Sequence, residues 1–260
     1  MIDRRDLLQA FAAVAATSCP LCRAGAADFP VGTYQPPGGN SRPATSSRRW
    51  NLEGGCGISA AAMGDAGSPR LARYTGNSFV DGGFARSRTY MVHAFGVSPA
   101  FAFLDDSESP NAFATPDNLI SWDRGTGSVV FGIRLLTGEV AADPQTWGSA
   151  LSLIMAHEWA HIRQFYNTGQ LPNPLAELHA DFLAGWWLGG FNIMTNGSGI
   201  NPNSAARSVF NKGDFAFNSP LHHGTPQQRV SAMVAGYQLS VGSNPNIHQA
   251  FSAGLQFLGG

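Results

Sequence analysis

Charged side chains are scarce in this 260-residue chain, where they make up 13% of the sequence, and lysine occurs only once, at Lys212. Acidic and basic residues nearly balance, so the formal net charge is −1 at pH 7. Binding to nucleic acid or to an anionic membrane surface needs clustered positive charge. The sequence contains no basic patch and no polybasic segment, and we therefore expect no nucleic acid and no membrane surface among the partners.

The sequence also lacks an apolar run long enough to span a bilayer as a helix, which takes about 20 residues. The apolar run near the start covers only residues 8–17, and Arg4 and Arg5 precede it. Small residues at positions 24–26 provide a cleavage site after residue 26. This arrangement resembles a twin-arginine export signal over residues 1–26. It predicts a periplasmic or secreted protein with no stable membrane span.

Cysteine is almost absent from the exported part of the chain. Cys19 and Cys22 lie within the signal, which leaves Cys56 alone. A chain with one cysteine forms no internal disulfide, even in the oxidising compartment that the signal predicts. Two alternatives remain for the first residues, namely an ordinary N-terminal helix and a lipoprotein signal with Cys19 as the lipid-bearing residue.

The remaining chain divides into a leader and one domain. Residues 27–49 are dense in proline, glycine, serine and threonine, and they predict a flexible leader because few apolar side chains offset the entropy of ordering. Residues 50–260 are long enough to bury one sizeable core and predict a single domain. Removal of residues 1–26 takes away three arginines and two aspartates and leaves 13 basic and 15 acidic side chains. The exported chain is therefore close to neutral.

Strands are predicted for four short runs rich in aromatic and small apolar residues, each bounded by turn residues. These runs are residues 90–95, 101–104, 110–114 and 128–132. Asp143 and Pro144 then predict the N-cap and the first position of a long helix, where proline is favoured. Strands followed by helices indicate an α+β fold, with a small mixed or antiparallel sheet and a mostly helical C-terminal part.

An H-E-x-x-H motif lies at residues 157–161, within the apolar run of that helix. Positions i and i+4 of a helix share one face, so His157 and His161 can bind one metal ion. Glu158 follows the first histidine and is placed to reach a water at the metal rather than the metal itself. The motif predicts one zinc ion per chain. The alternative is a pair of core histidines without a metal, which would be costly to desolvate.

A second apolar helix, which begins after Asn173-Pro174, carries the candidate third ligand. Glu177 and Asp181 are four residues apart and share a face, whereas His179 lies about 200° round the helix from Glu177. Glu177 would complete a His₂Glu set that leaves one position open, as catalytic zinc sites require. Asp181 would fix the tautomer of a ligating imidazole through a hydrogen bond. Solvated carboxylates, or His179 or Asp181 as the third ligand, are the alternatives.

These motifs resemble those of the gluzincin metallopeptidases, close to the M48 family and to the neutral zinc metallopeptidases of bacteria. The resemblance is carried by the H-E-x-x-H motif, by Glu177-x-x-Ala180-Asp181, by an Asn-Ala-Phe-Ala segment at 111–114 and by a late segment at 223–229. Metzincins do not fit, because Gln164 and Asn167 stand where those enzymes have glycine and histidine. The resemblance implies a zincin-like fold, in which a helix bearing the motif is followed by a helix bearing the glutamate.

The resemblance also implies roles for residues outside the two helices. The segment Asn111, Ala112, Phe113 and Ala114 would form the edge strand beside the cleft, where an extended substrate could pair with it. The late histidine, His223, and Arg229 would lie near the active site. An oxyanion at the metal needs a second donor, for which His223 or His222 is the best candidate, and Arg229 is expected to support the site. Gly224 replaces the proline that usually follows this histidine. A polar loop pair is the alternative for His222 and His223.

Together these features predict an exported zinc metalloendopeptidase that acts on a peptide or protein substrate, with Glu158 as the general base. Two alternatives belong to other classes, namely a non-catalytic zinc-binding module of the cell envelope and a metal hydrolase of non-peptide envelope material. Cys56 is expected to be a small buried hydrophobic residue. Blocking of the metal by the Cys56 thiolate, or of the site by the leader at 27–49, is left open.

Overall fold

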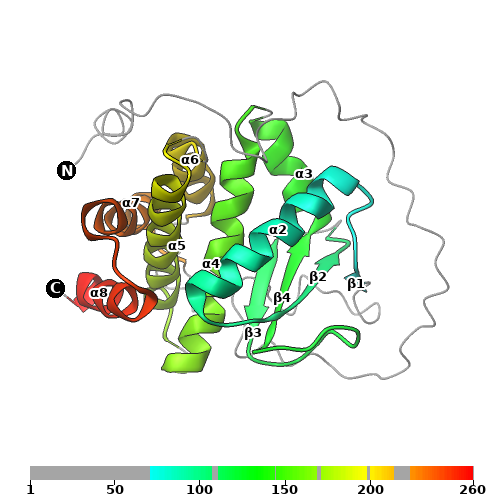
Figure 1. Cartoon of the computed structure of the whole chain (residues 1–260), viewed down its shortest axis with the longest axis horizontal. Coiled ribbons are helices and arrows are strands. Elements are labelled where there is room, and N and C mark those ends of the chain that lie inside the picture. Colours follow the sequence, from blue (N-terminus) through cyan, green and yellow to red (C-terminus); the bar gives the residue numbers. More distant parts are fainter. Residues whose placement is uncertain are drawn as a thin grey trace.

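A small β-sheet lies beside a group of helices in this protein (Figure 1). The computed structural model describes residues 71–106, 111–143, 145–168, 171–197, 200–213 and 223–259. The predicted export signal, the leader and Cys56 lie outside these residues, and so do Pro144 and His222. The fold is of the mixed α+β kind that the order of the sequence patterns predicts.

The sheet consists of four strands in the order β1-β2-β4-β3. They are β1 (Leu71–Ala72), β2 (Ala100–Leu104), β3 (Ala112–Thr115) and β4 (Ser128–Gly132). β2 runs parallel to β4, whereas β1 and β3 run antiparallel to their neighbours, so the sheet is mixed. β3 forms one edge of the sheet within the described part of the chain, next to α4.

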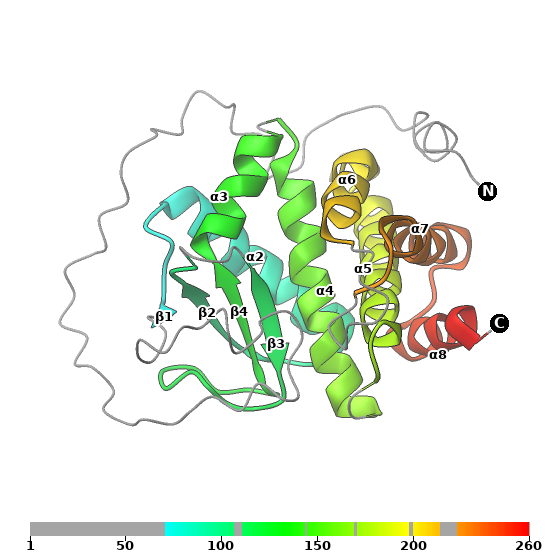
Figure 2. The ribbon, with the colours of Figure 1, turned by 180° about the vertical axis from the view of Figure 1, so that it is seen from behind.

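Helices make up most of the chain after the sheet. The described helices are α2 (Ser78–Phe95), α3 (Ile133–Ala142), α4 (Trp147–Asn167), α5 (Leu175–Met194), α6 (Pro202–Lys212), α7 (Pro226–Ser243) and α8 (Ile247–Gly259). α4 stands between the sheet and α5, and α5 in turn separates α4 from α7 and α8 (Figures 1 and 2). Within the described ranges, none of these helices is long and apolar enough to cross a membrane.

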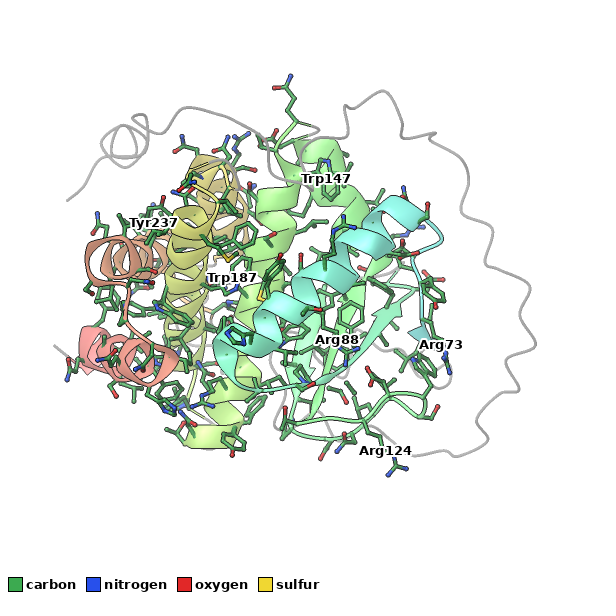
Figure 3. All side chains as sticks on the ribbon, viewed as in Figure 1. Arg73, Arg88, Arg124, Trp147, Trp187 and Tyr237 are labelled. Atoms are coloured by element: carbon green, nitrogen blue, oxygen red, sulfur yellow. The ribbon has the colours of Figure 1, made fainter. Side chains whose placement is uncertain are left out.

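Side-chain alternation along the strands gives the sheet two apolar faces. Phe103 and Phe131 face α2, where both pack edge-on against Phe84. Val130 and Phe113 point to the opposite face and join a smaller cluster with residues of the loop between β3 and β4. Figure 2 shows this second face with none of the described helices over it, while Figure 3 shows side chains filling the space between the helices and the sheet.

The segment 90–95 is helical, and the prediction of a strand there is wrong. The buried side chains of α2 recur at helical spacing along its whole length. They are Val80, Phe84, Ser87, Met91 and Phe95. A window of six residues shows only a short run rich in aromatic and apolar side chains, whereas the stripe is visible only over the full 18 residues of the helix. Gly96 then ends the helix in a left-handed conformation with φ of 64°, which glycine adopts without strain.

The start of the motif-bearing helix also differs from the prediction. α4 begins at Trp147, with Thr146 as its N-cap, rather than after Asp143. Asp143 is instead the C-cap of α3, a helix that the sequence patterns did not indicate, and its backbone N–H bonds the Glu139 carbonyl oxygen. The second helix begins where it was expected, because α5 starts at Leu175.

The buried Asp106 carboxylate ties α3 to the edge strand. Its two oxygens accept hydrogen bonds from the backbone N–H groups of Arg134 and Leu135 at 2.6 and 3.0 Å. The backbone N–H of Asn111 donates to the same carboxylate at 3.1 Å. A side chain at Gly132 would collide with Asp106, since an added Cβ would lie 1.9 Å from its Oδ2. This junction therefore sets where β3 begins relative to the helices.

Candidate metal centre

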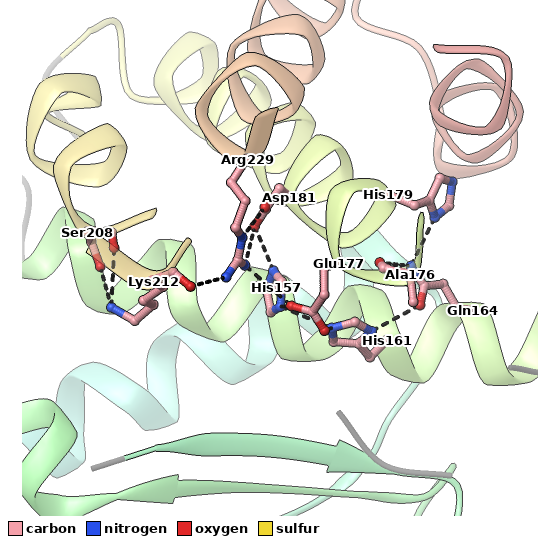
Figure 4. A network of polar contacts seen from close by, with 10 residues as sticks. All are labelled: His157, His161, Gln164, Ala176, Glu177, His179, Asp181, Ser208, Lys212 and Arg229. Atoms are coloured by element: carbon pink, nitrogen blue, oxygen red, sulfur yellow. Dashed lines mark hydrogen bonds and ion pairs between the residues drawn. The ribbon is translucent and has the colours of Figure 1, made fainter. Parts of the chain in front are cut away.

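The middle of α4 presents the H-E-x-x-H motif inside the protein. Every residue of α4 from 147 to 164 is buried, because the sheet and α2 cover one side of this helix and α5 covers another. His157, Glu158 and His161 are only 8%, 4% and 1% exposed. From the facing helix α5, Glu177 points toward the two histidines (Figure 4). The structure thus brings together the three predicted ligands.

The spacing of these three side chains suits a metal ion. The Nε2 atoms of His157 and His161 lie 3.0 Å apart. Glu177 places Oε2 at 3.3 Å from the first of these nitrogens and Oε1 at 3.5 Å from the second. Two ligands held at 2.0–2.1 Å by a tetrahedral zinc would stand roughly 3.3 Å apart. The buried group can therefore hold a metal ion, with one protein oxygen and two nitrogens as ligands.

Asp181 determines which ring nitrogen of His157 carries a proton. The His157 Nδ1 lies 2.9 Å from Asp181 Oδ1. Arg229 donates two hydrogen bonds to the same carboxylate, from Nε at 2.7 Å and Nη2 at 2.9 Å. Burial raises the pKa of Asp181, but Arg229 and His157 outweigh burial and hold this pKa below its usual value. Because an ionised carboxylate only accepts, the neutral form of His157 carries its proton on Nδ1 and has its lone pair on Nε2.

Gln164 fixes the protonation of His161 in the same way. The His161 Nδ1 lies 3.0 Å from Gln164 Oε1. The amide nitrogen of Gln164 donates to the Ala176 carbonyl oxygen at 2.9 Å. A flipped amide would set two oxygens against each other at Ala176, so Oε1 must be the atom that faces His161. His161 therefore donates from Nδ1, and its Nε2 lone pair is also free.

Lone pairs of two imidazoles and a carboxylate thus converge in a space shielded from solvent. Such a group of acceptors is repulsive unless a positive charge lies among them. Burial lowers the pKa of His157, but the carboxylates of Asp181 and Glu177 outweigh it and raise this pKa to about 10. Burial and His157 together lower the pKa of His161 to about 4. The centre therefore favours one positive charge, carried by a proton or by a metal ion.

Glu158 stands apart from this group and has a different environment. Its Oε2 atom is buried and has no hydrogen-bond partner within the described part of the protein. Burial raises the pKa of Glu158 to about 8. For Glu177, by contrast, the effect of burial is outweighed by the two imidazoles and Arg229, which hold its pKa well below the usual range. Glu177 is thus an ionised carboxylate that could bind a metal ion, and Glu158 is a carboxyl group whose proton affinity is high.

A cavity of about 300 Å³ adjoins the centre. Glu158 lies on its wall together with Asn111 and Ala112 from the start of the edge strand. The other two residues of the predicted edge segment do not line it. Phe113 points to the far face of the sheet, and Ala114 belongs to the main core. The cavity therefore meets the edge strand at its first residues only.

The structure describes three of the four remaining candidate residues. His223 lines the cavity and is half-buried. Arg229 lies behind His157 and Glu177, where it bonds Asp181 and also places Nη2 at 3.5 Å from Glu177 Oε2. His222 lies outside the described residues. His179 is fully buried and faces away from His157, His161 and Glu177 (the metal group), as the helical spacing predicts.

Two parts of the site escaped prediction from the sequence. In the sequence, Gln164 was recognised only as a departure from the metzincin motif. Its position three residues after His161 nevertheless places it on the same helix face. Lys212, the single lysine, lines the cavity and pairs with Glu139 and Ser208. The Lys212 carbonyl oxygen also accepts a hydrogen bond from Arg229 Nη1 at 3.2 Å. No periodicity in the sequence signals a contact between α6 and the start of α7.

Compared with protein-family models, with curated proteins and with solved structures, the chain gives no match. The structure itself shows a buried group of His157, His161 and Glu177 that could hold a metal ion.

Proposed function

We propose that this protein is a zinc-dependent metallopeptidase whose centre is formed by His157, His161 and Glu177. The observation that carries the proposal is the convergence of three buried candidate ligand atoms beside a buried carboxyl oxygen of Glu158 that has no hydrogen-bond partner among the described residues. A purely structural zinc site is usually closed by four protein ligands and has no use for a nearby base. Three ligands and a cavity fit a catalytic centre better.

Zinc is the metal that this set of ligands suits best. Two imidazole nitrogens and one carboxylate oxygen form one of the ligand sets of catalytic zinc sites. A calcium or magnesium ion would call for more oxygen ligands. The hydrogen bonds from the Nδ1 atoms of His157 and His161 orient both rings, as metal-binding histidines require.

The chemistry of hydrolysis follows from the placement of Glu158. Bound zinc would lower the pKa of a water molecule and polarise the scissile carbonyl group. Glu158 accepts the proton of the attacking water and later passes it to the leaving amine. In the metal-free protein, burial raises the pKa of this carboxyl group to about 8. His223, on the cavity wall, is the candidate second donor to the oxyanion.

The edge strand gives the proposal its substrate class. β3 is antiparallel to β4 on one side, and its other edge borders the α4 side of the sheet. An extended peptide can add to such an edge through main-chain hydrogen bonds, which give affinity with little side-chain selectivity. Asn111 and Ala112 lie where this edge meets the cavity, so the peptide bond next to them would be the one that is cleaved.

The same proposal includes a fold type and a location outside the cytoplasm. The arrangement of an edge strand, a motif helix and a glutamate-bearing helix is the one expected of a zincin-like fold and of the gluzincins, to which the motifs bear a resemblance. The paired arginines and the short apolar run at the start support export by a twin-arginine-type signal, and thus a periplasmic or secreted enzyme.

Replacement of Glu158 by glutamine tests the proposal. The Glu158→Gln variant keeps the shape of the side chain and all three ligands, but an amide cannot accept the proton. We expect near-complete loss of peptide hydrolysis in a cleavage-profiling assay, with the zinc content unchanged. Asp117→Asn makes the same chemical change at an exposed carboxylate and should leave hydrolysis as it is. A wild-type protein that binds zinc and cleaves no peptide would instead favour a non-catalytic zinc-binding module of the cell envelope.

A further inference from the structure

His179 is completely buried on the side of α5 that faces away from the metal group. Buried histidines need partners for both ring nitrogens, and His179 has them on two different helices. Its Nδ1 lies 3.1 Å from the amide nitrogen of Gln164 on α4. Its Nε2 lies 3.0 Å from the Phe251 carbonyl oxygen on α8. Figure 4 shows His179 and Gln164 as the continuation of the polar contacts that begin at His161.

The direction of each hydrogen bond in this series is determined by carbonyl groups at its ends. The Phe251 carbonyl oxygen only accepts, so His179 donates from Nε2 and accepts at Nδ1 as a neutral ring. The Ala176 carbonyl oxygen holds the amide nitrogen of Gln164, which donates its second hydrogen to His179. Oε1 of Gln164 is then left to accept from His161. The series has one consistent arrangement of protons, and that arrangement directs the His161 Nε2 lone pair to the metal group.

α8 packs against the ring of His179 as closely as a helix can. The rings of His179 and Phe251 stand edge to face with their centres 4.6 Å apart. Gly254, one turn further along α8, lies so near that an added Cβ would be 2.7 Å from Cδ2 and 2.8 Å from Nε2 of His179. Gly259, in the same helix, has nothing within 4 Å of such a Cβ. The position of α8 therefore controls the position of the imidazole.

We propose that Gln164 and His179 are positioning residues of the metal centre, through which the docking of the C-terminal helix α8 sets the orientation of the ligand His161. The inference rests on the proposed metal function, since it assigns the support of one of its ligands. It differs from the role of Asp181 and Arg229, which hold the other histidine from α5 and α7. Each histidine ligand is thus held by its own set of partners.

The test measures metal affinity, by competition with a chelator, and the unfolding of the metal-free protein side by side. Gln164→Met keeps length but removes the acceptor for His161, and we expect a 10–100-fold loss of zinc affinity, as for other partners of metal ligands. His179→Phe keeps the ring shape and removes both hydrogen bonds, with an expected loss of roughly threefold to tenfold because the effect passes through Gln164. Gly254→Ala should weaken zinc binding in the same direction, while Gly259→Ala should not.

The double variant Gln164→Met/His179→Phe shows whether His179 acts through Gln164. If it does, adding His179→Phe to Gln164→Met costs no further zinc affinity, because the two residues act through one hydrogen-bond series. The visible absorption spectrum of the cobalt-loaded protein should change in the single variants, because the ring of a ligand has turned. A merely structural role would lower stability and leave both the affinity and the spectrum unaltered.

The possible outcomes separate this inference from the proposed function. A wild-type protein that binds zinc, with affinities unchanged in Gln164→Met and Gly254→Ala, overturns the inference and leaves the metal centre standing. Independent losses in the double variant also overturn it. A wild-type protein that binds no zinc overturns the proposed function itself. Should His179→Phe fail to fold, Gly254→Ala against Gly259→Ala still decides the matter.

Discussion

At the scale of single residues, the hydrogen-bond partners of the two histidines determine which ring nitrogens can face a metal ion. Asp181 and the oriented amide of Gln164 place a proton on the outer nitrogen of each histidine, so the inner nitrogens present lone pairs when both rings are neutral. Sequence spacing alone predicted that His157 and His161 share one helix face. The separation of about 200° around the helix predicted that His179 points away from the side of Glu177. Spacing could not reveal that His179 still touches the partner of a ligand, because that link joins side chains from different helices.

The two carboxylates on α5 should fail differently when they are removed. Glu177→Ala deletes one of three protein ligands, so zinc should be largely lost at ordinary concentrations. Asp181→Ala keeps all three ligands but frees the His157 ring and leaves Arg229 without its main partner. We expect a 10–100-fold loss of affinity there, with part of the activity restored by excess zinc. Chelator competition on both variants gives the order, and a weaker effect for Glu177→Ala would mean that it is not a ligand.

At the scale of elements, the sequence predicted well those segments whose pattern is local. β4 and the start of α5 are where they were expected, since a short apolar strand and an Asn-Pro step carry their own signals. Residues 90–95 were misread because the buried stripe of α2 emerges only over its full length. Asp143 followed by proline imitates a helix start, yet burial of Trp147 against the core fixes the true beginning of α4.

Close contact between α5 and α7 keeps Arg229 within reach of the ligands. An added Cβ at Gly236 would lie 1.8 Å from the Phe182 carbonyl oxygen, whereas Gly242 in the same helix has nothing within 4 Å. We expect Gly236→Ala to lower the free energy of unfolding by about 1–3 kcal/mol or more, as overpacking does. Gly242→Ala should raise it by about 0.5–1 kcal/mol, since alanine favours helix. Chemical denaturation of the two metal-free variants measures the difference, and equal effects would refute this packing.

At the scale of the whole molecule, the metal centre joins parts of the fold that are distant in sequence. α4 contributes His157 and His161 and α5 contributes Glu177 to the group that could hold a metal ion, while α6 and α7 meet behind it through Lys212 and Arg229. The edge strand reaches the cavity only because Asp106 fixes Asn111 beside α3. These junctions depend on tertiary contacts, which explains why the motifs predicted the ligands but not the groups that hold them.

Removal of the metal should therefore destabilise the entire domain and not only the site. A ligand that binds only the folded chain stabilises it by about 2.7 kcal/mol at 100 times its dissociation constant. We expect a chelator to lower the unfolding temperature and added zinc to raise it with concentration. The His157→Ala/His161→Ala variant should respond to neither. An identical response in that variant would place the stabilising metal elsewhere.

The central claim is that His157, His161 and Glu177 hold a zinc ion, and elemental analysis of the purified protein tests it most directly. We expect about one zinc per wild-type chain, because the described part of the structure shows one buried group that could hold a metal ion and a His₂Glu set suits one zinc. The same measurement on His157→Ala and on His161→Ala should find that zinc lost. Equal metal content in the wild-type protein and in the double variant would contradict the account.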